Sequence, residues 1–375
     1  MRLLIYIAFS ISVLWSNYAV YSAEPTYFSL MSNDIGVDTK NYYLDLLDSL
    51  IQKNEFKEIN SVVVLHENEI IYEKYYNGYD SSSLHNTRSA SKSITGILIG
   101  MAIDQKYIDS EKDPIFKYLD NYDSAKNPDK RKEDITIEDL LTMSSILECD
   151  DFNQFSRGHE ERMYLVEDWV NFFIDLPIKG YAEWVTKPED SPFGRSFSYC
   201  TAGVVTLGRI IELATEMTIT EFTKKHLFDP LEIKNYQWQY TPTGMAMTGG
   251  GLQLTSYDYA KIGQLYLNKG LWKNKPLVSS GWIEKSTKPQ VQFMPNMKYG
   301  YLFWISNFGT KNNQYDSYYM SGAGGNKIAV IPDLNAVIVI TSTLFGSANA
   351  HQQSEKILNE YIVPEISNLI SNKNH

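Results

Sequence analysis

Cysteine is nearly absent from this chain, and the two that occur exclude one class of site. Cys149 and Cys200 belong to no Cys-x-x-Cys pair and to no cluster of cysteine and histidine. A structural zinc site of the usual spacing is therefore excluded. The sequence leaves two alternatives open for the pair, which are a disulfide formed in an oxidising compartment or two buried free thiols.

Positive charge is also scarce. The chain has 34 Lys and Arg against 45 Asp and Glu, which gives a formal net charge of -11, and no run of basic residues interrupts it. Most of the surface would repel a polyanion. We therefore expect no nucleic-acid partner.

Long apolar runs are missing except at the start of the chain. Leu3 to Trp15 is apolar, follows Met1-Arg2, and precedes the small residues Ser22 and Ala23. This layout is typical of a signal peptide, here residues 1–23, and the apolar part is short of the ~20 residues that a membrane-spanning helix needs. We expect a mature chain from about Glu24 that is secreted or periplasmic, with no stable membrane span. The alternative is an uncleaved N-terminal anchor.

Several motifs of known chemistry do not occur. The chain has no Gly-x-Ser-x-Gly, no His-Glu-x-x-His and no Gly-x-x-x-x-Gly-Lys. Gly322–Gly325 is rich in glycine, but strand-forming residues follow it, so no helix N-terminus is present to hold a phosphate. We expect neither a metal ion nor a cofactor.

What remains is a globular chain of 375 residues, 43% hydrophobic, with 27 tyrosines. Apolar periodicity predicts a helix over 42–51 and a hairpin of strands at 61–65 and 70–76, and helical patterns dominate from about 89 to 267. Strands return at 299–305, 328–331 and 336–341, the last two joined by a turn at 332–335, and a helix follows over 353–369.

Strands at both ends of the chain enclose a long helical middle. This order predicts an α+β fold in which one sheet is built from residues 24–88 and 290–375, with a mainly helical part, 89–289, inserted between them. Residues 24–375 would form one domain without internal repeats.

The helical part opens on a pattern with chemical meaning. Ser89 and Lys92 are three residues apart, so on a helix they share one face and the amine can reach the hydroxyl. A serine hydroxyl needs a base to take its proton, and lysine serves only where burial or positive charge lowers its pKa. The apolar residues that follow, with Gly96 and Gly100 permitting close approach of another element, predict that this helix is buried.

A Ser-x-x-Lys string alone is weak, because a chain of this composition yields roughly one or two by chance. The surrounding motifs add to it. They are His85–Lys92, Leu140–Ser145, Pro192–Tyr199, Gly249–Leu252 and Gly324–Pro332. With these, nearly the whole mature chain resembles the serine beta-lactamase and penicillin-binding-protein superfamily. It is most similar to the class C beta-lactamase-like branch, which includes 6-aminohexanoate-dimer hydrolases and family VIII carboxylesterases.

The resemblance implies an antiparallel sheet flanked by helices and a set of roles. Ser89 would be the nucleophile and Lys92 its base, and Tyr199 would take the place of the tyrosine in the family's Tyr-x-Asn motif, relaying a proton with Lys92. The backbone N–H groups of Ser89 and of the Gly322–Ala323 region would form the oxyanion hole.

Two departures from the family pattern bear on the substrate. Thr201 stands where the family usually has asparagine, which replaces an amide with a hydroxyl. Met320-Ser321-Gly322 stands where penicillin-recognising members have Lys-Thr-Gly, so the cation that would pair with a substrate carboxylate is missing. The departures favour an ester or an amide without such a carboxylate.

An acidic and aromatic segment, Cys149–Tyr164, resembles the loop that covers the site in the 6-aminohexanoate-dimer hydrolase group. Tyr164 is a candidate substrate contact. The alternative is a solvated loop with one packed tyrosine.

The sequence therefore predicts a serine hydrolase that acts on a small-molecule carboxylic ester or linear amide through an acyl-enzyme. Two alternatives stay open. One is a beta-lactamase or D-Ala-D-Ala peptidase, and the other is a non-catalytic binding or sensor protein of the same fold.

Overall fold

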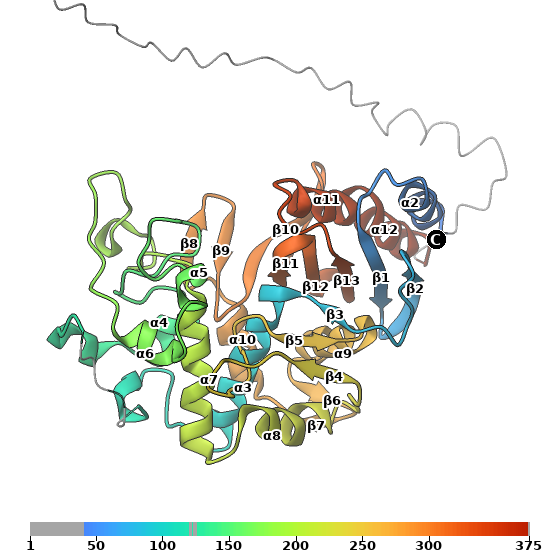
Figure 1. Cartoon of the computed structure of the whole chain (residues 1–375). Helices are drawn as coiled ribbons and strands as arrows, with labels where there is room; N and C mark the ends of the chain where they lie inside the picture. Colours follow the sequence, from blue (N-terminus) through green and yellow to red (C-terminus); the bar gives the residue numbers. More distant parts are fainter. Residues whose placement is uncertain (1–40, 120–121, 123–125, 374–375) are drawn as a thin grey trace, which may run out of the picture. The chain divides into compact units, whose positions relative to one another are not determined.

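An eight-stranded antiparallel sheet organises the part of the chain that the structure describes (Figure 1). The computed structural model describes residues 41–119, 122 and 126–373, so the predicted leader, 1–23, lies outside the described residues. In spatial order the strands are β2 (Glu69–Tyr75), β1 (Ile59–His66), β13 (Ala336–Ser342), β12 (Asn326–Ile331), β11 (Asn313–Gly322), β10 (Trp304–Thr310), β9 (Met297–Tyr299) and β8 (Val291–Met294).

The two ends of the described chain meet inside this sheet. Strand β1 lies between its hairpin partner β2 and β13, with Val63 opposite Val339. All residues of β1, β12 and β13 are buried. Their nearly continuous apolar runs follow from this position, because helices cover both faces of the sheet and leave no polar side.

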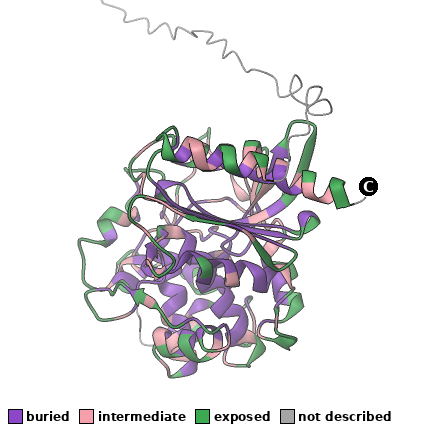
Figure 2. Cartoon of the chain, turned by 90° about the vertical axis from the view of Figure 1, so that its right-hand side faces the viewer, coloured by how far each residue is buried: buried purple, intermediate pink, exposed green. Residues whose placement is uncertain are grey.

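Helices cover the sheet from both sides. Helices α2 (Tyr42–Gln52), α11 (Ala350–Ile357) and α12 (Val363–Lys373) lie on one face, and α9 (Ser256–Leu267) packs against β1, β12 and β13 on the other. Figure 2 shows exposed residues on the outer side of the first layer and buried residues on the sheet side. Helix α9 belongs by sequence to the predicted helical part, although it packs on the sheet.

The remaining helices form a body below the sheet, together with short strands. They are α3 (Lys92–Asp104), α4 (Ile137–Leu141), α5 (Glu160–Met163), α6 (Trp169–Ile174), α7 (Thr201–Thr215), α8 (Ile219–Thr223) and α10 (Ser280–Thr287). The short strands are β3 (His85–Asn86), β4 (Tyr236–Trp238), β5 (Leu252–Leu254), β6 (Leu271–Trp272) and β7 (Lys275–Pro276). Among the described residues, no helix is both long and apolar enough to cross a membrane.

Helix α3 is enclosed, as its sequence predicts. Of its 13 residues, 11 are buried, because apolar side chains occur all around its circumference. A side chain at Gly100 would meet the ring of Trp282 at 2.3 Å, and one at Gly96 would meet the carbonyl oxygen of Tyr301 at 3.0 Å. Both glycines therefore allow the close approach expected of them.

One predicted strand differs from the structure. The run 299–305 is interrupted between β9 and β10, and Leu302 adopts a positive φ of 61°. The main chain is drawn out of the sheet here, because Leu302 N donates to Leu141 O and Leu302 O accepts from the hydroxyl of Ser93 on α3. Strand β11, rich in tyrosine and polar residues, was not predicted from the apolar pattern.

Candidate active site

A tight turn presents Ser89 at the start of the buried helix. Residues Arg88–Ser91 form η1, one turn of 3-10 helix that leads directly into α3. Arg88 has a positive φ of 53°, a conformation that is uncommon for a residue with a side chain. Ser89 itself is half-buried, so its hydroxyl is enclosed but reachable.

Lys92 is buried directly behind this serine. Its Nζ lies 2.8 Å from Ser89 Oγ and 2.5 Å from the carbonyl oxygen of Gly249, and the residue is 1% exposed. Burial lowers the pKa of Lys92, while the nearby carboxylates of Glu160 and Asp151 act in the opposite direction. The neutral amine that a base requires is thus favoured by the surroundings of Lys92.

Tyr199 completes a triangle of side chains. Lys92 Nζ lies 5.2 Å from the centre of the Tyr199 ring, and the Tyr199 phenol interacts with the Ser89 side chain. Burial raises the pKa of Tyr199 well above its usual value. The structure therefore brings together Ser89, Lys92 and Tyr199, which come from η1, α3 and the residue before Cys200.

Gly249 has to be a glycine for Lys92 and Thr201 to share this space. A side chain at Gly249 would meet Thr201 Cγ2 at 2.6 Å, while the carbonyl of Gly249 holds the Lys92 amine. Thr201 begins helix α7 and lies close to the same cluster. The glycine run noted in the sequence is in this way part of the site.

Two carboxylates accept hydrogen bonds from Thr201, and their negative charges act on Lys92. Thr201 N donates to Asp151 Oδ2 at 2.7 Å, and Thr201 Oγ1 donates to Glu160 Oε2 at 3.1 Å. Burial raises the pKa of Asp151 to about 6, and the positive charge of Lys92 opposes this rise. Where the family has the asparagine of Tyr-x-Asn, this chain has a threonine with an acidic pair.

Tyr164 lies at the outer edge of this group. Its hydroxyl is 3.4 Å from Glu160 Oε2, and its ring contacts Trp169 at 5.2 Å between centroids. It is linked to Thr201 only through Glu160. A substrate contact at Tyr164 stays a prediction.

Gly322 packs against the turn that carries the serine, and Ala323 follows it in the chain. A side chain at Gly322 would lie 1.8 Å from the carbonyl oxygen of Thr87 and 3.0 Å from the amide nitrogen of Ala90. Gly322 is buried and Ala323 is exposed. The end of β11 therefore touches η1, so the main chains of both elements lie close to Ser89.

The two cysteines are joined. Cys149 and Cys200 form a disulfide with their Cα atoms 5.3 Å apart, which decides between the two alternatives left by the sequence. The bond ties the loop that carries Asp151 to the residue after Tyr199. Two hydrogen bonds reinforce it, from Asp151 N to Tyr199 O at 2.8 Å and from Ser198 Oγ to Cys149 O at 2.6 Å.

This arrangement is suited to acyl transfer. The Ser89 hydroxyl has beside it an amine with a lowered pKa, a buried phenol and the main chain of two elements, which are the kinds of group that acyl transfer uses. Within the described ranges, no group of three or more His, Cys, Asp or Glu side chains is placed to hold a metal ion.

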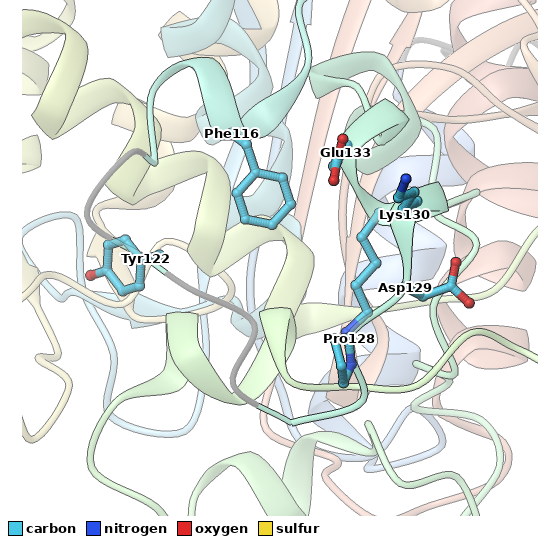
Figure 3. A pocket seen from close by; sticks show the side chains of 7 residues that line it. Phe116, Tyr122, Pro128, Asp129, Lys130 and Glu133 are labelled. Carbon is cyan, nitrogen blue, oxygen red and sulfur yellow. The ribbon is translucent and has the colours of Figure 1, made fainter.

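Two hollows of the described surface lie away from this cluster. One, of about 360 Å³, is lined by Phe116, Tyr122, Pro128, Asp129, Lys130, Lys132 and Glu133. Figure 3 shows the two aromatic rings on one side of it and Lys130 and Glu133 on the other. This hollow shares no residue with the cluster around Ser89.

The sequence did not reveal Asp151, Glu160 or Phe152 as individual members of the site. Phe152 stacks on Tyr199 with 4.9 Å between ring centroids. The only signal was the resemblance of the whole segment to a covering loop. Acidic residues in a loop are usually solvated, so the sequence offered no reason to single them out.

This chain is similar to known proteins in sequence and in fold. A family model described as "Beta-lactamase" matches residues 60–360. The 6-aminohexanoate-dimer hydrolase of Paenarthrobacter ureafaciens is 26% identical over 247 residues, which is 64% of this chain and 59% of that protein. The chain thus matches well under two thirds of the length of this relative.

Solved structures share the fold at low sequence identity. A candidate 6-aminohexanoate-dimer hydrolase from Bacillus anthracis has a TM-score of 0.68 at 20% identity, covering 87% of this chain and 82% of its own. A penicillin binding protein from Bacillus halodurans has a TM-score of 0.62 at 18% identity, and the match covers 83% of this chain and 98% of that protein. A D-stereospecific amidohydrolase from Streptomyces has a TM-score of 0.61 at 14% identity, and the match covers 83% of this chain and 96% of that protein.

Proposed function

The chain belongs to the beta-lactamase family of serine hydrolases, and on that premise we propose that it cleaves carboxylic esters or linear amides through an acyl-enzyme on Ser89. One observation carries this proposal: the Lys92 amine is buried, has a lowered pKa and lies 2.8 Å from Ser89 Oγ. A neutral amine at this distance can accept the hydroxyl proton as the oxygen attacks.

The first half of the reaction forms the acyl-enzyme. Ser89 Oγ bonds to the substrate carbonyl carbon while its proton passes to Lys92 Nζ. The carbonyl oxygen becomes an oxyanion that the N–H groups of Ser89 and of the Gly322–Ala323 region would stabilise. When the intermediate collapses, the bond to the leaving group breaks, and the proton held by Lys92 and Tyr199 passes to the departing oxygen or nitrogen.

The second half returns the enzyme. Water attacks the acyl carbon and gives one proton to the Lys92 and Tyr199 pair, and this proton then restores the Ser89 hydroxyl as the acid leaves. Burial lowers the pKa of Lys92 and raises that of Tyr199, so both effects favour an uncharged amine beside an uncharged phenol. Lys92 is therefore the proton acceptor and Tyr199 the donor in our proposal.

The site electrostatics support esters and linear amides over penicillins. Met320 is fully buried at the position of the family's lysine, so no cation stands there for a substrate carboxylate. Asp151 and Glu160 add negative charge close to Lys92. A substrate that carries a carboxylate at this point would lack a partner and face repulsion.

The test compares the mature protein with a Ser89→Ala variant. We expect a fluorophosphonate probe to label only the wild type, and p-nitrophenyl esters to be hydrolysed only by the wild type. A Lys92→Ala variant should lose about 100-fold or more in kcat, the usual contribution of a positioned base.

Other outcomes would assign a different role. Absence of both labelling and turnover would identify a non-catalytic binding or sensor protein. Steady hydrolysis of a chromogenic cephalosporin would instead identify a beta-lactamase. Full ester turnover by Lys92→Ala would exclude Lys92 as the base.

We also propose that the protein works outside the cytoplasm. The disulfide between Cys149 and Cys200 supports this, because such bonds persist mainly in oxidising compartments. The test is mass spectrometry of the protein recovered from its native cells. A mature N-terminus near Glu24 is expected, and a reduced chain that begins at Met1 would contradict the proposal.

A further inference from the structure

An aromatic cluster leads from the surface to the catalytic centre. Six rings contribute to it, from the loop after Cys149, the segment before Cys200 and the strands β8, β9 and β10. They are Phe152, Phe197, Tyr199, Phe293, Tyr299 and Trp304. The Phe152 ring lies 4.9 Å from that of Tyr199, nearly parallel at 16°, and 5.7 Å from that of Phe293.

Burial changes sharply along this cluster. Tyr199 is 7% exposed and Trp304 is 9% exposed, whereas Phe152 is 60% exposed. Met294, next to Phe293 on β8, is 53% exposed. A single exposed ring needs no explanation. Phe152, however, is stacked on Tyr199, which lies beside Ser89. Its ring therefore makes an apolar surface that is continuous with the site.

The position of Tyr199 identifies which part of a substrate meets this surface. In the proposed reaction the Tyr199 hydroxyl passes its proton to the leaving group, while the oxyanion lies toward Gly322 and Ala323. A surface built onto the Tyr199 ring therefore lies on the leaving-group side of Ser89.

We propose that Phe152 and Phe293 form a subsite for an apolar or aromatic leaving group. This rests on the proposed hydrolysis at Ser89 and deepens it by naming the class of alcohol or amine released. An aromatic leaving group would stack beside Phe152, where ring pairs at 4.5–7 Å are stabilising beyond the area they bury.

The ring is held in place before any substrate binds. Phe152 N donates to Asp150 Oδ1 at 3.0 Å, and the neighbouring Asp151 N donates to Tyr199 O at 2.8 Å. The disulfide from Cys149 to Cys200 anchors the same loop just before this point in the chain. A side chain on such a tied loop loses little conformational freedom on binding, so its contact contributes to affinity.

The experiment uses two series of esters with the full mature protein. In the first, benzyl acetate is compared with methyl acetate, whose alcohols are leaving groups of similar acidity, so the ratio of kcat/KM reports recognition. In the second, p-nitrophenyl acetate, butyrate and hexanoate vary the acyl group at constant leaving group. The variants are Phe152→Ala and Phe152→Leu, and the control variant is Phe155→Ala. Phe155 lies on the same loop and is 80% exposed.

We expect Phe152→Ala to lower the ratio for benzyl over methyl acetate about tenfold, the effect of losing roughly 1.4 kcal/mol of ring contact. For Phe152→Leu, the ratio of kcat/KM for benzyl over methyl acetate should lie between the values of the alanine variant and the wild type. The acyl series should keep its order in every variant. Phe155→Ala should match the wild type in both series.

Three results would overturn the inference. An equal loss for benzyl and methyl acetate would mean that Phe152 only positions Tyr199. A change confined to the acyl series would place the subsite on the acyl side. Wild-type protein that neither turns over any ester nor reacts with a fluorophosphonate would remove the proposed function itself, an outcome distinct from the other two.

Discussion

At the scale of single residues, the charge state of Lys92 depends on opposing influences. Burial lowers its pKa and the carboxylates of Glu160 and Asp151 raise it. The same two carboxylates accept hydrogen bonds from the backbone N–H and the hydroxyl of Thr201. They therefore position Thr201 as well as act on the pKa of Lys92. A change in one carboxylate should therefore shift the working pH range of the base.

Glu160→Gln tests this effect. The variant removes a charge that raises the pKa of Lys92, and its amide oxygen can still accept from Thr201 Oγ1. In the proposed mechanism only the neutral Lys92 amine acts as base, so kcat/KM should rise as pH rises through the pKa of Lys92. We expect this rising limb to move to lower pH in the variant, measured with a p-nitrophenyl ester.

The neighbouring Glu161→Gln is the matched control for charge. Glu161 lies on the same short helix and is exposed, so its variant should leave the profile of kcat/KM against pH unchanged. A shift of the Glu160→Gln limb to higher pH, or an equal shift in both variants, would refute this account of Lys92.

Residue by residue, the sequence predicted the positions that carry a family motif. The structure places Ser89, Lys92, Tyr199 and Thr201 close together, and the roles that the resemblance implies for them stay predictions. Glu160 could not be singled out, because its importance depends on a loop fold that brings it to Thr201 from 41 residues away. Local patterns carry no information on such a contact.

At the scale of elements, the disulfide joins a loop to the N-terminus of α7. The bonded residues are 51 positions apart, so the bond restricts the unfolded chain considerably. Chain-entropy estimates for a loop of this length give about 4 kcal/mol of stabilisation. The same bond fixes the loop beside Tyr199.

A Cys149→Ser, Cys200→Ser double variant should therefore be less stable and less active. We expect the urea midpoint of unfolding to fall, with a loss in free energy of unfolding of up to about 4 kcal/mol. Each single variant, and wild type treated with a dithiol, should resemble the double variant. An unchanged midpoint after confirmed reduction would show that the hydrogen bonds alone hold this loop.

The contact between β11 and the serine turn supports a second prediction at this scale. Gly322→Ala would place a methyl group 1.8 Å from Thr87 O, so β11 and η1 must separate. We expect kcat/KM for p-nitrophenyl acetate to fall about 100-fold, as when one oxyanion donor is lost.

Gly281→Ala provides the control for this substitution. Gly281 lies in α10, and a side chain there has nothing within 4 Å. Its variant should keep full activity, because alanine is well tolerated in a helix. Equal activity of Gly322→Ala and wild type would show that β11 contributes no donor near Ser89.

The elements were predicted unevenly, for physical reasons. The hairpin of β1 and β2 and the buried helix α3 follow from local apolar patterns, and the structure has them. The break between β9 and β10 does not follow from such patterns, since it arises where Leu302 O accepts from the Ser93 hydroxyl on α3 and Leu302 N donates to Leu141 O. Tertiary contacts override strand propensity at that point.

At the scale of the whole described chain, both ends contribute to one sheet and α3 is buried beneath it. Strand β1 pairs with β13, so residues such as Val62 and Ile340 meet across most of the sequence. Neither the sheet nor the helical body can bury its apolar face alone. The two should therefore unfold together.

We predict a single unfolding transition. Ile338→Ala in β13 and Ile97→Ala in α3 remove fully buried side chains and should each cost about 2–5 kcal/mol. Both should lower the midpoint of the same transition, with far-UV circular dichroism and tryptophan fluorescence changing together. Two separate transitions, with each variant moving only one, would instead show independent sheet and helical units.

The stacking of Trp304 on Tyr199 gives the site an intrinsic optical reporter. The two rings lie 6.0 Å apart at 21°, and Trp304 is one of seven tryptophans. In the proposed reaction, acylation of Ser89 would change the polarity near Tyr199 and this indole, so the emission of Trp304 should change. The difference between wild type and Trp304→Phe would follow formation and breakdown of the acyl-enzyme in real time, with substrates that release no coloured product.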